Sequence, residues 1–212
     1  ARLQVQSRGL ETPLHELIRP EHDLGLGRLP APSEGDVFFD FEGDPYWGDD
    51  GLEYLFGSWF QADGEWTFMP IWAKDRSEEL AATEQWLDWI TARVERFPDL
   101  HVFHFNNYEV TTLKRLTQKY STREDELDNL LRRKIFVDLY PITTQSARIG
   151  IERYGLKALE AVYGFERSED IDAIGSLWRW QNFQDDGEQR WLDEIATYNL
   201  DDCKSTKALY EW

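Results

Sequence analysis

A short apolar segment that ends in carboxylates constrains this chain more than any other feature: residues 36–44 read DVFFDFEGD. Its Val and Phe residues favour a β-strand, and Gly43, with Pro45 directly after the segment, terminates the strand. Side chains two positions apart in a strand point to the same side, so Asp40 and Glu42 project from one face. Adjacent carboxylates repel each other and are costly to hold among phenylalanines, unless a divalent cation removes that cost. The segment therefore predicts half of a metal site or, alternatively, a strand end with both acids on its wet face.

Composition favours a folded domain and places limits on its partners. The chain has 212 residues, of which 41% are hydrophobic and 15% aromatic, enough for one globular core. Its single cysteine, Cys203, excludes a disulfide framework and favours a cytoplasmic location. No apolar run reaches about 18 residues, so we expect no membrane partner. The formal charge of −18 disfavours nucleic acid, although acids that bind cations also count towards it.

The order of apolar patterns along the chain predicts a mixed sheet. We expect strands over residues 36–42, 52–60, 65–72, 101–105 and 135–139. We expect helices from residue 77 up to Pro98, and over residues 108–119, 122–134, 156–163 and 188–211. A turn at residues 62–64 joins the second and third strands, so the first three form an antiparallel meander. This order predicts an α/β fold, with a mixed five-stranded sheet of meander and then parallel strands, flanked by helices.

The proline-rich start of the chain differs from the remainder. Residues 1–34 are polar and aperiodic, so we expect an N-terminal extension or linker there, and the folded domain over residues 35–212.

Two further sets of polar residues, Glu109 and the pair Tyr198 and Asp202, are candidates for the same site. Glu109 opens the helix after the fourth strand, at the carboxyl edge of the sheet, where open α/β sheets bind ligands. Alternatively, it only complements the dipole of that helix. Tyr198 and Asp202 are four residues apart and share one face of the last helix, whereas Asp201 points elsewhere. On their own these two favour a solvated helix surface with a partly buried Tyr.

Together these segments resemble the DEDD family of 3′→5′ exonucleases, which have a ribonuclease-H-like fold. The resemblance rests on three motifs in order, Asp40-x-Glu42, Asn106…Tyr108-Glu109 and Tyr198-x-x-x-Asp202. The tyrosine of the third motif resembles the DEDDy branch rather than the branch with histidine. Glu109 is a departure, because the superfamily usually has Asp there.

Nearly all of residues 30–212 also resembles a bacterial ribonuclease-H-like domain that is found beside RecB/Cas4-type nuclease modules and often a helicase. The segments that carry this likeness are FDFEGDP (39–45), EYLFG (53–57), HF…YE (104–109), FVDLYP (136–141), LKALE (156–160) and YN-x-DD (198–202).

The resemblance implies a 3′→5′ exonuclease that hydrolyses phosphodiester bonds of single-stranded nucleic acid, with DNA favoured over RNA. It implies two divalent cations, Mg²⁺ or Mn²⁺. The implied metal ligands are Asp40, Glu42, Glu109 and Asp202, with Asp40 bridging both ions. Tyr198 is the fifth catalytic residue and orients the attacking water. The implied partners are single-stranded nucleic acid and RecB/Cas4-type nuclease and helicase modules of the same or a partner chain. Substrate contacts are expected from Asn106, Asn107, Lys157 and Tyr46.

Two other functions stay open. An endonuclease of the ribonuclease H type would share the fold, but that class has a single Asp on its first strand, so Asp40-x-Glu42 argues against it. A catalytically weak module that grips nucleic acid or contacts other parts of a larger nuclease–helicase is favoured by the charge of −18 and by Glu109. The complete set of Asp40, Glu42, Tyr198 and Asp202 disfavours that module. The choice of DNA or RNA depends on contacts to the 2′-OH, which spacing does not reveal.

Overall fold

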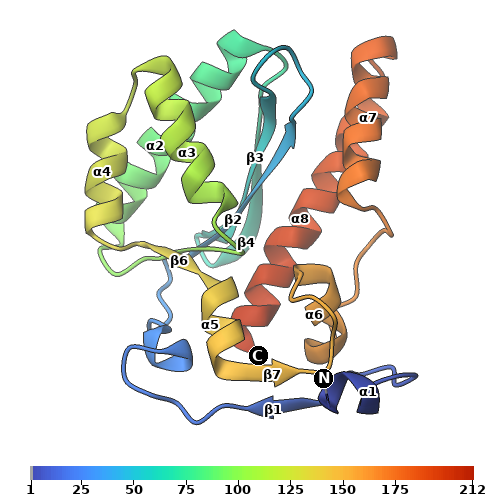
Figure 1. The fold of residues 1–212 in the computed structure, drawn as a ribbon. Coiled ribbons are helices and arrows are strands. Elements are labelled where there is room, and N and C mark those ends of the chain that lie inside the picture. Colours follow the sequence, from blue (N-terminus) through green and yellow to red (C-terminus); the bar gives the residue numbers. More distant parts are fainter. Residues whose placement is uncertain (1) are drawn as a thin grey trace.

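A five-stranded mixed sheet forms the centre of the molecule in this computed structural model, which describes residues 2–212 (Figure 1). Its spatial order is β4 (Glu65–Trp72), β3 (Leu52–Ala62), β2 (Val37–Asp44), β5 (Val102–His104) and β6 (Phe136–Asp138). The pairs β4–β3 and β3–β2 are antiparallel, whereas β2–β5 and β5–β6 are parallel. The predicted meander followed by parallel strands is therefore confirmed.

Helices cover both faces of this sheet (Figure 1). One face carries α2 (Arg76–Arg96), α3 (Tyr108–Tyr120) and α4 (Glu124–Arg132). The other carries α5 (Leu139–Ser146), α6 (Leu156–Tyr163), α7 (Ala173–Asp186) and α8 (Gln189–Glu211). Among residues 2–212, no helix combines the length and the apolar character needed to cross a membrane.

Side chains along β2 alternate between the two faces of the sheet, so that most of its apolar residues lie on one face and Asp40 and Glu42 on the other. Val37, Phe39 and Phe41 pack under the face that carries α2 and α3. Phe38 points to the opposite face and packs with residues of α5, α6 and α8. Because the strand period is two, Asp40 and Glu42 share the face of Phe38, beneath α8.

A glycine lets α8 approach the sheet closely. Gly57 of β3 pairs with Asp40 of β2. A Cβ atom at Gly57 would lie 1.6 Å from the side-chain oxygen of Asn199, so no other residue fits under this part of α8. The contact places the third motif of α8 directly over the acids of β2.

The N-terminal residues form three short elements, α1 (Arg2–Gln6), β1 (His15–Leu17) and the 3₁₀ helix η1 (Gly25–Arg28). β1 pairs antiparallel with β7 (Ala147–Ile149) in a separate two-stranded sheet. The amide of Gly25 donates to the side chain of Gln145, which ties η1 to α5.

Two of the helices that cover the five-stranded sheet were missing from the sequence-based prediction. We expected the last strand to continue through Leu139, but α5 begins there. Asp138 caps this helix by accepting from the amide of Tyr140 at 2.9 Å. Pro141 fits its first turn, where a backbone N–H is not needed. α7 buries only Ser176 and Trp180, while Ile174 and Trp178 are exposed, so its sequence lacks a clear apolar stripe.

Candidate active site

Three carboxylates from two distant segments meet beneath α8. Asp40 and Glu42 come from β2 and Asp202 from α8, and each offers an oxygen within 4.8 Å of the others. The strand period of two aligns the first pair, and the packing of α8 on Gly57 brings the third residue to them. We call Asp40, Glu42 and Asp202 the carboxylate cluster. Two of the three sequence-based motifs therefore contribute side chains to one place.

The carboxylate cluster is electrostatically unfavourable in the absence of a cation. Burial, and then the charges of Asp202 and Glu42, raise the pKa of Asp40 well above its ordinary value. Burial and the charge of Asp202 raise the pKa of Glu42 to about 8. Like charges in a buried site favour protonation, whereas a divalent cation would favour the ionised forms.

Neutral donors from α8 and α7 orient the acids of β2. The side-chain amide of Asn199 donates to Asp40 Oδ2 at 2.9 Å and to Glu42 Oε1 at 3.4 Å. The hydroxyl of Ser176 donates to Glu42 Oε2 at 2.9 Å, so the Tyr54 hydroxyl, also at 2.9 Å, donates to Ser176. Asn199 stands inside a motif singled out from the sequence, but we assigned it no role. Ser176 was missed because no local pattern marks it.

Glu109 lies beside the carboxylate cluster but outside it. Its side chain, 3% exposed, is in the first turn of α3, and its Oε2 atom lies 3.1 Å from His104 Nδ1. The same ring nitrogen lies 2.7 Å from the carbonyl oxygen of Asn106, so Nδ1 carries a proton and donates to both acceptors. Burial lowers the pKa of His104, but Glu109 outweighs it and the net change is upward. Glu109 still reaches Asp40, whose pKa it raises through its charge and a side-chain hydrogen bond.

Tyr198 lies at the edge of the carboxylate cluster, one helical turn before Asp202. Its side chain is buried and donates a hydrogen bond to Asp202. Burial and the charges of Asp202, Glu42 and Asp40 raise the pKa of Tyr198 above its ordinary value, so the phenol keeps its proton. The alternative of a solvated helix surface is therefore wrong for this part of α8, where Asp201 is also buried and accepts from Ser168.

A family comparison agrees with this arrangement. The family model described as RNase_H superfamily matches residues 37–212, from the start of β2 through the end of α8. The chain belongs to the RNase_H superfamily. No curated protein and no solved structure matches the chain. Membership indicates nuclease-type activity, because proteins of this superfamily are generally nucleases or other hydrolases.

The donor set of this RNase_H superfamily site fits a hard divalent cation. The carboxylate cluster supplies only oxygen atoms, and oxygen is the ligand that Mg²⁺, Mn²⁺ and Ca²⁺ prefer. Burial and neighbouring carboxylates raise the pKa values of Asp40 and Glu42, and a cation would offset this repulsion. The buried carboxylates could therefore hold a metal ion, and an ion would stabilise them.

The predicted substrate-binding residues lie in different surroundings. Asn106 has a positive φ of 76° just before α3, and its side chain accepts from the amide of Asn107 at 2.9 Å. Lys157 Nζ lies 5.5 Å from the centroid of the Tyr198 ring, next to the carboxylate cluster, and donates to the carbonyl of Ile171. Tyr46 is 78% exposed, in the loop after β2. Of these four residues, the described contacts connect only Lys157 to the third motif.

Proposed function

We propose that this domain is a divalent-metal-dependent 3′→5′ exonuclease of single-stranded nucleic acid and belongs to the DEDDy branch of its superfamily. The observation that carries the proposal is the meeting of Asp40, Glu42 and Asp202 within 4.8 Å, with Tyr198 hydrogen-bonded to the third of them. The 3′→5′ polarity rests on the likeness of the three motifs to DEDD exonucleases. The preference for DNA rests on the likeness to domains that accompany RecB/Cas4-type nuclease and helicase modules.

The residues of the site divide into ligands and orienting groups. Asp40, Glu42 and Asp202 would hold two cations, Mg²⁺ or Mn²⁺, and Glu109 would complete the set beside Asp40. When bound, the cations lower the pKa of water and stabilise the charge that develops on the phosphate oxygens. Asn199 and Ser176 keep the carboxylates of β2 in place through the hydrogen bonds described above.

Tyr198 positions the nucleophile and does not act as the base. Its pKa is raised by burial and by three nearby carboxylates, so the phenol cannot accept the proton of water near neutral pH. A protonated phenol can still donate or accept one hydrogen bond and so fix the direction of a water molecule. Its contact with Asp202 keeps that phenol beside the metal ligands.

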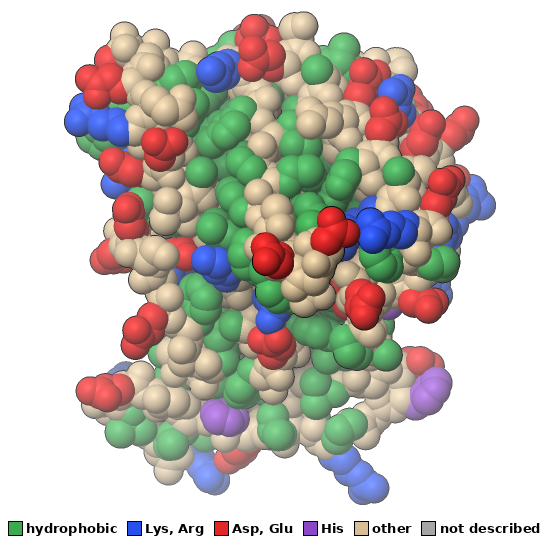
Figure 2. Space-filling view, turned by 180° about the vertical axis from the view of Figure 1, so that it is seen from behind, with side chains coloured by type: hydrophobic (Ala, Val, Ile, Leu, Met, Phe, Trp, Pro, Cys, Tyr) green, Lys and Arg blue, Asp and Glu red, His purple; other side chains and the backbone are tan. Residues whose placement is uncertain are grey.

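The surface charge suggests that this domain binds nucleic acid weakly and with strong salt dependence. On the face seen in Figure 2, Asp and Glu are spread over the surface, and the described Lys and Arg residues are scattered rather than gathered into one patch. With a formal charge of −18, long-range attraction to a polyanion is missing. We propose that neighbouring nuclease or helicase modules supply the affinity, and that residues 1–34 are an extension of a domain formed by residues 35–212.

A degradation assay tests the proposed activity. We expect 5′-labelled single-stranded DNA to give a ladder of products shortened one nucleotide at a time with Mn²⁺ or Mg²⁺, and none with EDTA. RNA of the same sequence should be degraded more slowly. A 3′-terminal phosphate should slow the reaction, and circular single-stranded DNA should stay intact. Release of a labelled mononucleotide as the first product, or cutting of the circle, would contradict the proposal.

A catalytically weak binding module is the second candidate, because Glu109 pairs with His104 and lies beside the carboxylate cluster rather than within it. In that case the domain would bind Mn²⁺ and single-stranded DNA, yet the DNA would remain uncut over hours. The variant His104→Gln separates the two functions. Under the weak-module interpretation it frees Glu109 and raises cleavage, whereas under the exonuclease interpretation it lowers cleavage.

A further inference from the structure

Arg167 joins the third motif to α6 through a single buried guanidinium. It lies in the irregular segment between α6 and α7, and its side chain is only 8% exposed. Its Nη2 atom donates to Asp202 Oδ1 at 2.6 Å and to Glu160 Oε1 at 2.6 Å. Its Nε atom donates to Glu160 Oε2 at 3.0 Å, so the contact with Glu160 is bidentate.

Glu160 is also held in place by a contact that does not involve the arginine. The hydroxyl of Ser205 donates to Glu160 Oε1 at 2.7 Å, and the hydroxyl of Tyr163 lies 2.8 Å from Ser205. Glu160 and Tyr163 belong to α6, whereas Ser205 belongs to α8. The planar guanidinium therefore takes its orientation from a fixed partner on α6, and not from Asp202 alone.

The same guanidinium also lies against the other residue of the third motif. Its central carbon is 5.6 Å from the centroid of the Tyr198 ring, a distance suited to cation–π attraction. The remaining nitrogen, Nη1, is buried and has no hydrogen-bond partner among residues 2–212. Arg167 therefore contacts both Tyr198 and Asp202, and its other nitrogens are hydrogen-bonded to Glu160 and Asp202.

We propose that Arg167 is a positioning residue that fixes Asp202 and Tyr198 relative to Asp40 and Glu42 before a cation binds. This inference rests on the proposed function, since it requires Asp202 to be a metal ligand. The hydrogen bond to Oδ1 restricts the rotation of the Asp202 carboxylate. Hydrogen bonds to ligating carboxylates commonly orient them in this way, and their loss weakens metal binding by about 10- to 100-fold.

Mn²⁺ binding in the absence of nucleic acid tests this role. Removing Arg167 alone would leave Glu160 buried and unpaired, so the comparison starts from Glu160→Gln. That change keeps one acceptor oxygen for the guanidinium and leaves its contact with Asp202. Adding Arg167→Gln then removes the contact with Asp202 without leaving a charged Glu160 buried and unpaired. Free Mn²⁺ is measured by electron paramagnetic resonance, well below the melting temperature of each variant, with circular dichroism to show that the fold is kept.

The outcomes separate this inference from the proposed function. We expect Glu160→Gln to bind Mn²⁺ within about threefold of the wild type, and the double variant to bind at least about tenfold more weakly. The Mn²⁺ concentration for half-maximal cleavage should rise by the same factor. Equal or tighter binding by the double variant, while Asp40→Asn loses binding, would overturn the role of Arg167 and leave the proposed function intact. A wild type that binds no Mn²⁺ would overturn both.

Discussion

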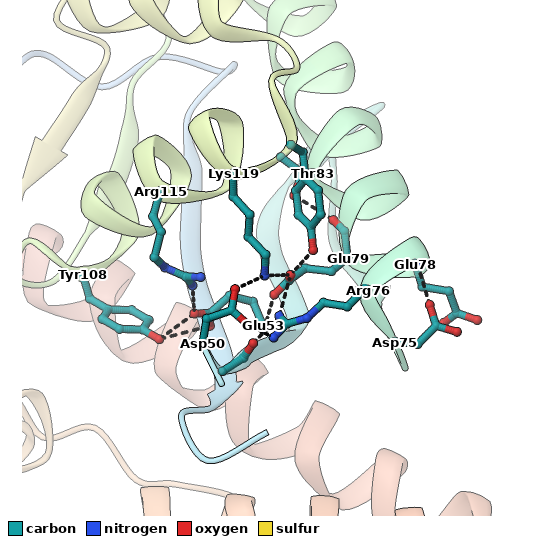
Figure 3. Close-up of polar contacts among 12 residues, drawn as sticks. Asp50, Glu53, Asp75, Arg76, Glu78, Glu79, Thr83, Tyr108, Arg115 and Lys119 are labelled. Carbon is teal, nitrogen blue, oxygen red and sulfur yellow. Dashed lines mark hydrogen bonds and ion pairs between the residues drawn. The ribbon is translucent and has the colours of Figure 1, made fainter. Parts of the chain in front are cut away.

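The carboxylate cluster and a second group of buried acids differ in how their negative charge is compensated. The second group contains the buried Glu53 and Glu79, the exposed Asp50, the cations Arg76, Arg115 and Lys119, and the phenols of Tyr108 and Tyr120; we call it the Glu53–Glu79 network (Figure 3). It joins the sheet to α2 and α3 and lies close enough to the cluster for the charge of Glu53 to raise the pKa of Glu42.

In the network, burial outweighs the donors of Glu53 and raises its pKa, whereas the donors of Glu79 outweigh its burial. The Oε2 atom of Glu79 accepts from Lys119 at 2.9 Å, from Arg76 at 3.2 Å and from the hydroxyl of Tyr120. Its Oε1 atom accepts from the amide of Glu53 at 2.7 Å. Burial alone would raise the pKa of Glu79, but these donors outweigh it, so that the pKa lies below its ordinary value.

The carboxylate cluster has the opposite balance. Among the ion pairs of residues 2–212, only the one between Arg167 and Asp202 reaches it, and none involves Asp40 or Glu42. The pKa of Asp40 lies above its ordinary value, whereas that of Glu79 lies below its ordinary value. The buried acids of the network therefore come with fixed cations, whereas the acids of the cluster have few and could hold a metal ion instead.

The largest expected effect comes from neutralising one acid of the carboxylate cluster. We expect Asp40→Asn to lower the metal-dependent cleavage rate by more than the roughly 100-fold that loss of an outer hydrogen-bond partner costs. In EDTA the same variant should melt at a higher temperature than the wild type, because a buried carboxylate with a raised pKa is gone. Cleavage rates and melting curves in EDTA check both expectations. A variant that is inactive and also less stable in EDTA would mean that Asp40 supports the fold.

The corresponding change in the Glu53–Glu79 network should affect stability instead. Glu79→Gln leaves the cations of Lys119 and Arg76 without their buried partner, a change that costs about 3–5 kcal/mol. For a domain of this size, that lowers the melting temperature by roughly 10 °C. The rate of cleavage, measured on folded protein at low temperature, should stay within about twofold of the wild type. A loss of cleavage comparable to that of Asp40→Asn would remove the distinction between the two groups of acids.

The pH dependence of stability should also distinguish the two groups. The pKa of Glu42 is about 8 in the folded protein, against an ordinary value of 4.5. Between these pH values the folded state holds a proton that the unfolded state has released, so stability falls as pH rises through this window. In EDTA we expect the melting temperature to drop by at least about 5 °C from pH 5 to pH 8. Saturating Mn²⁺ should abolish the drop.

A control isolates Glu42 from other groups that titrate in the same range. The raised pKa of His104 also makes stability fall with rising pH. Glu42→Gln keeps His104, removes the contribution of Glu42 and lessens that of Asp40, whose pKa the charge of Glu42 raises. Its melting temperature in EDTA should therefore depend less on pH than that of the wild type. If the melting temperatures of the two proteins depend equally on pH, the titration of Glu42 does not cause the loss of stability.

The parts of the cluster that follow a local period were predictable from the sequence. The strand period of two placed Asp40 beside Glu42, and the helix period placed Tyr198 beside Asp202, because both depend only on backbone geometry. The mixed sheet followed from the order of apolar segments, since short turns enforce the meander. The prediction of Glu109 at the start of a helix also agrees with α3.

The partners of these residues could not be predicted, because they are tertiary contacts with no local pattern. Arg167 lies 35 residues before Asp202, in a segment without helix or strand. Ser176 lies on the buried side of α7. Because Ile174 and Trp178 of this helix are exposed, its apolar residues do not follow a helical period that would identify that side. The Glu53–Glu79 network likewise joins a loop, a strand and two helices, and only the folded chain shows which acid meets which cation.

The smallest expected effect concerns the boundary between the two groups of acids. The hydroxyl of Tyr108, the residue before Glu109, lies 3.0 Å from both carboxylate oxygens of Glu53. Tyr108→Phe removes this hydrogen bond but keeps the ring beside Phe41, and Arg115 still pairs with Glu53. We expect a loss of about 1–2 kcal/mol, which lowers the melting temperature by roughly 2–6 °C.

Cleavage by Tyr108→Phe tests whether the network merely adjoins the carboxylate cluster or also controls it. Glu53 keeps a cation in this variant, so its charge and its influence on Glu42 change little. The rate of cleavage and the Mn²⁺ concentration for half-maximal rate should therefore match the wild type within about twofold. If the Mn²⁺ requirement shifts tenfold while the melting temperature barely moves, the hydroxyl acts through Glu109 on the metal site. The two groups of acids would then be one functional unit.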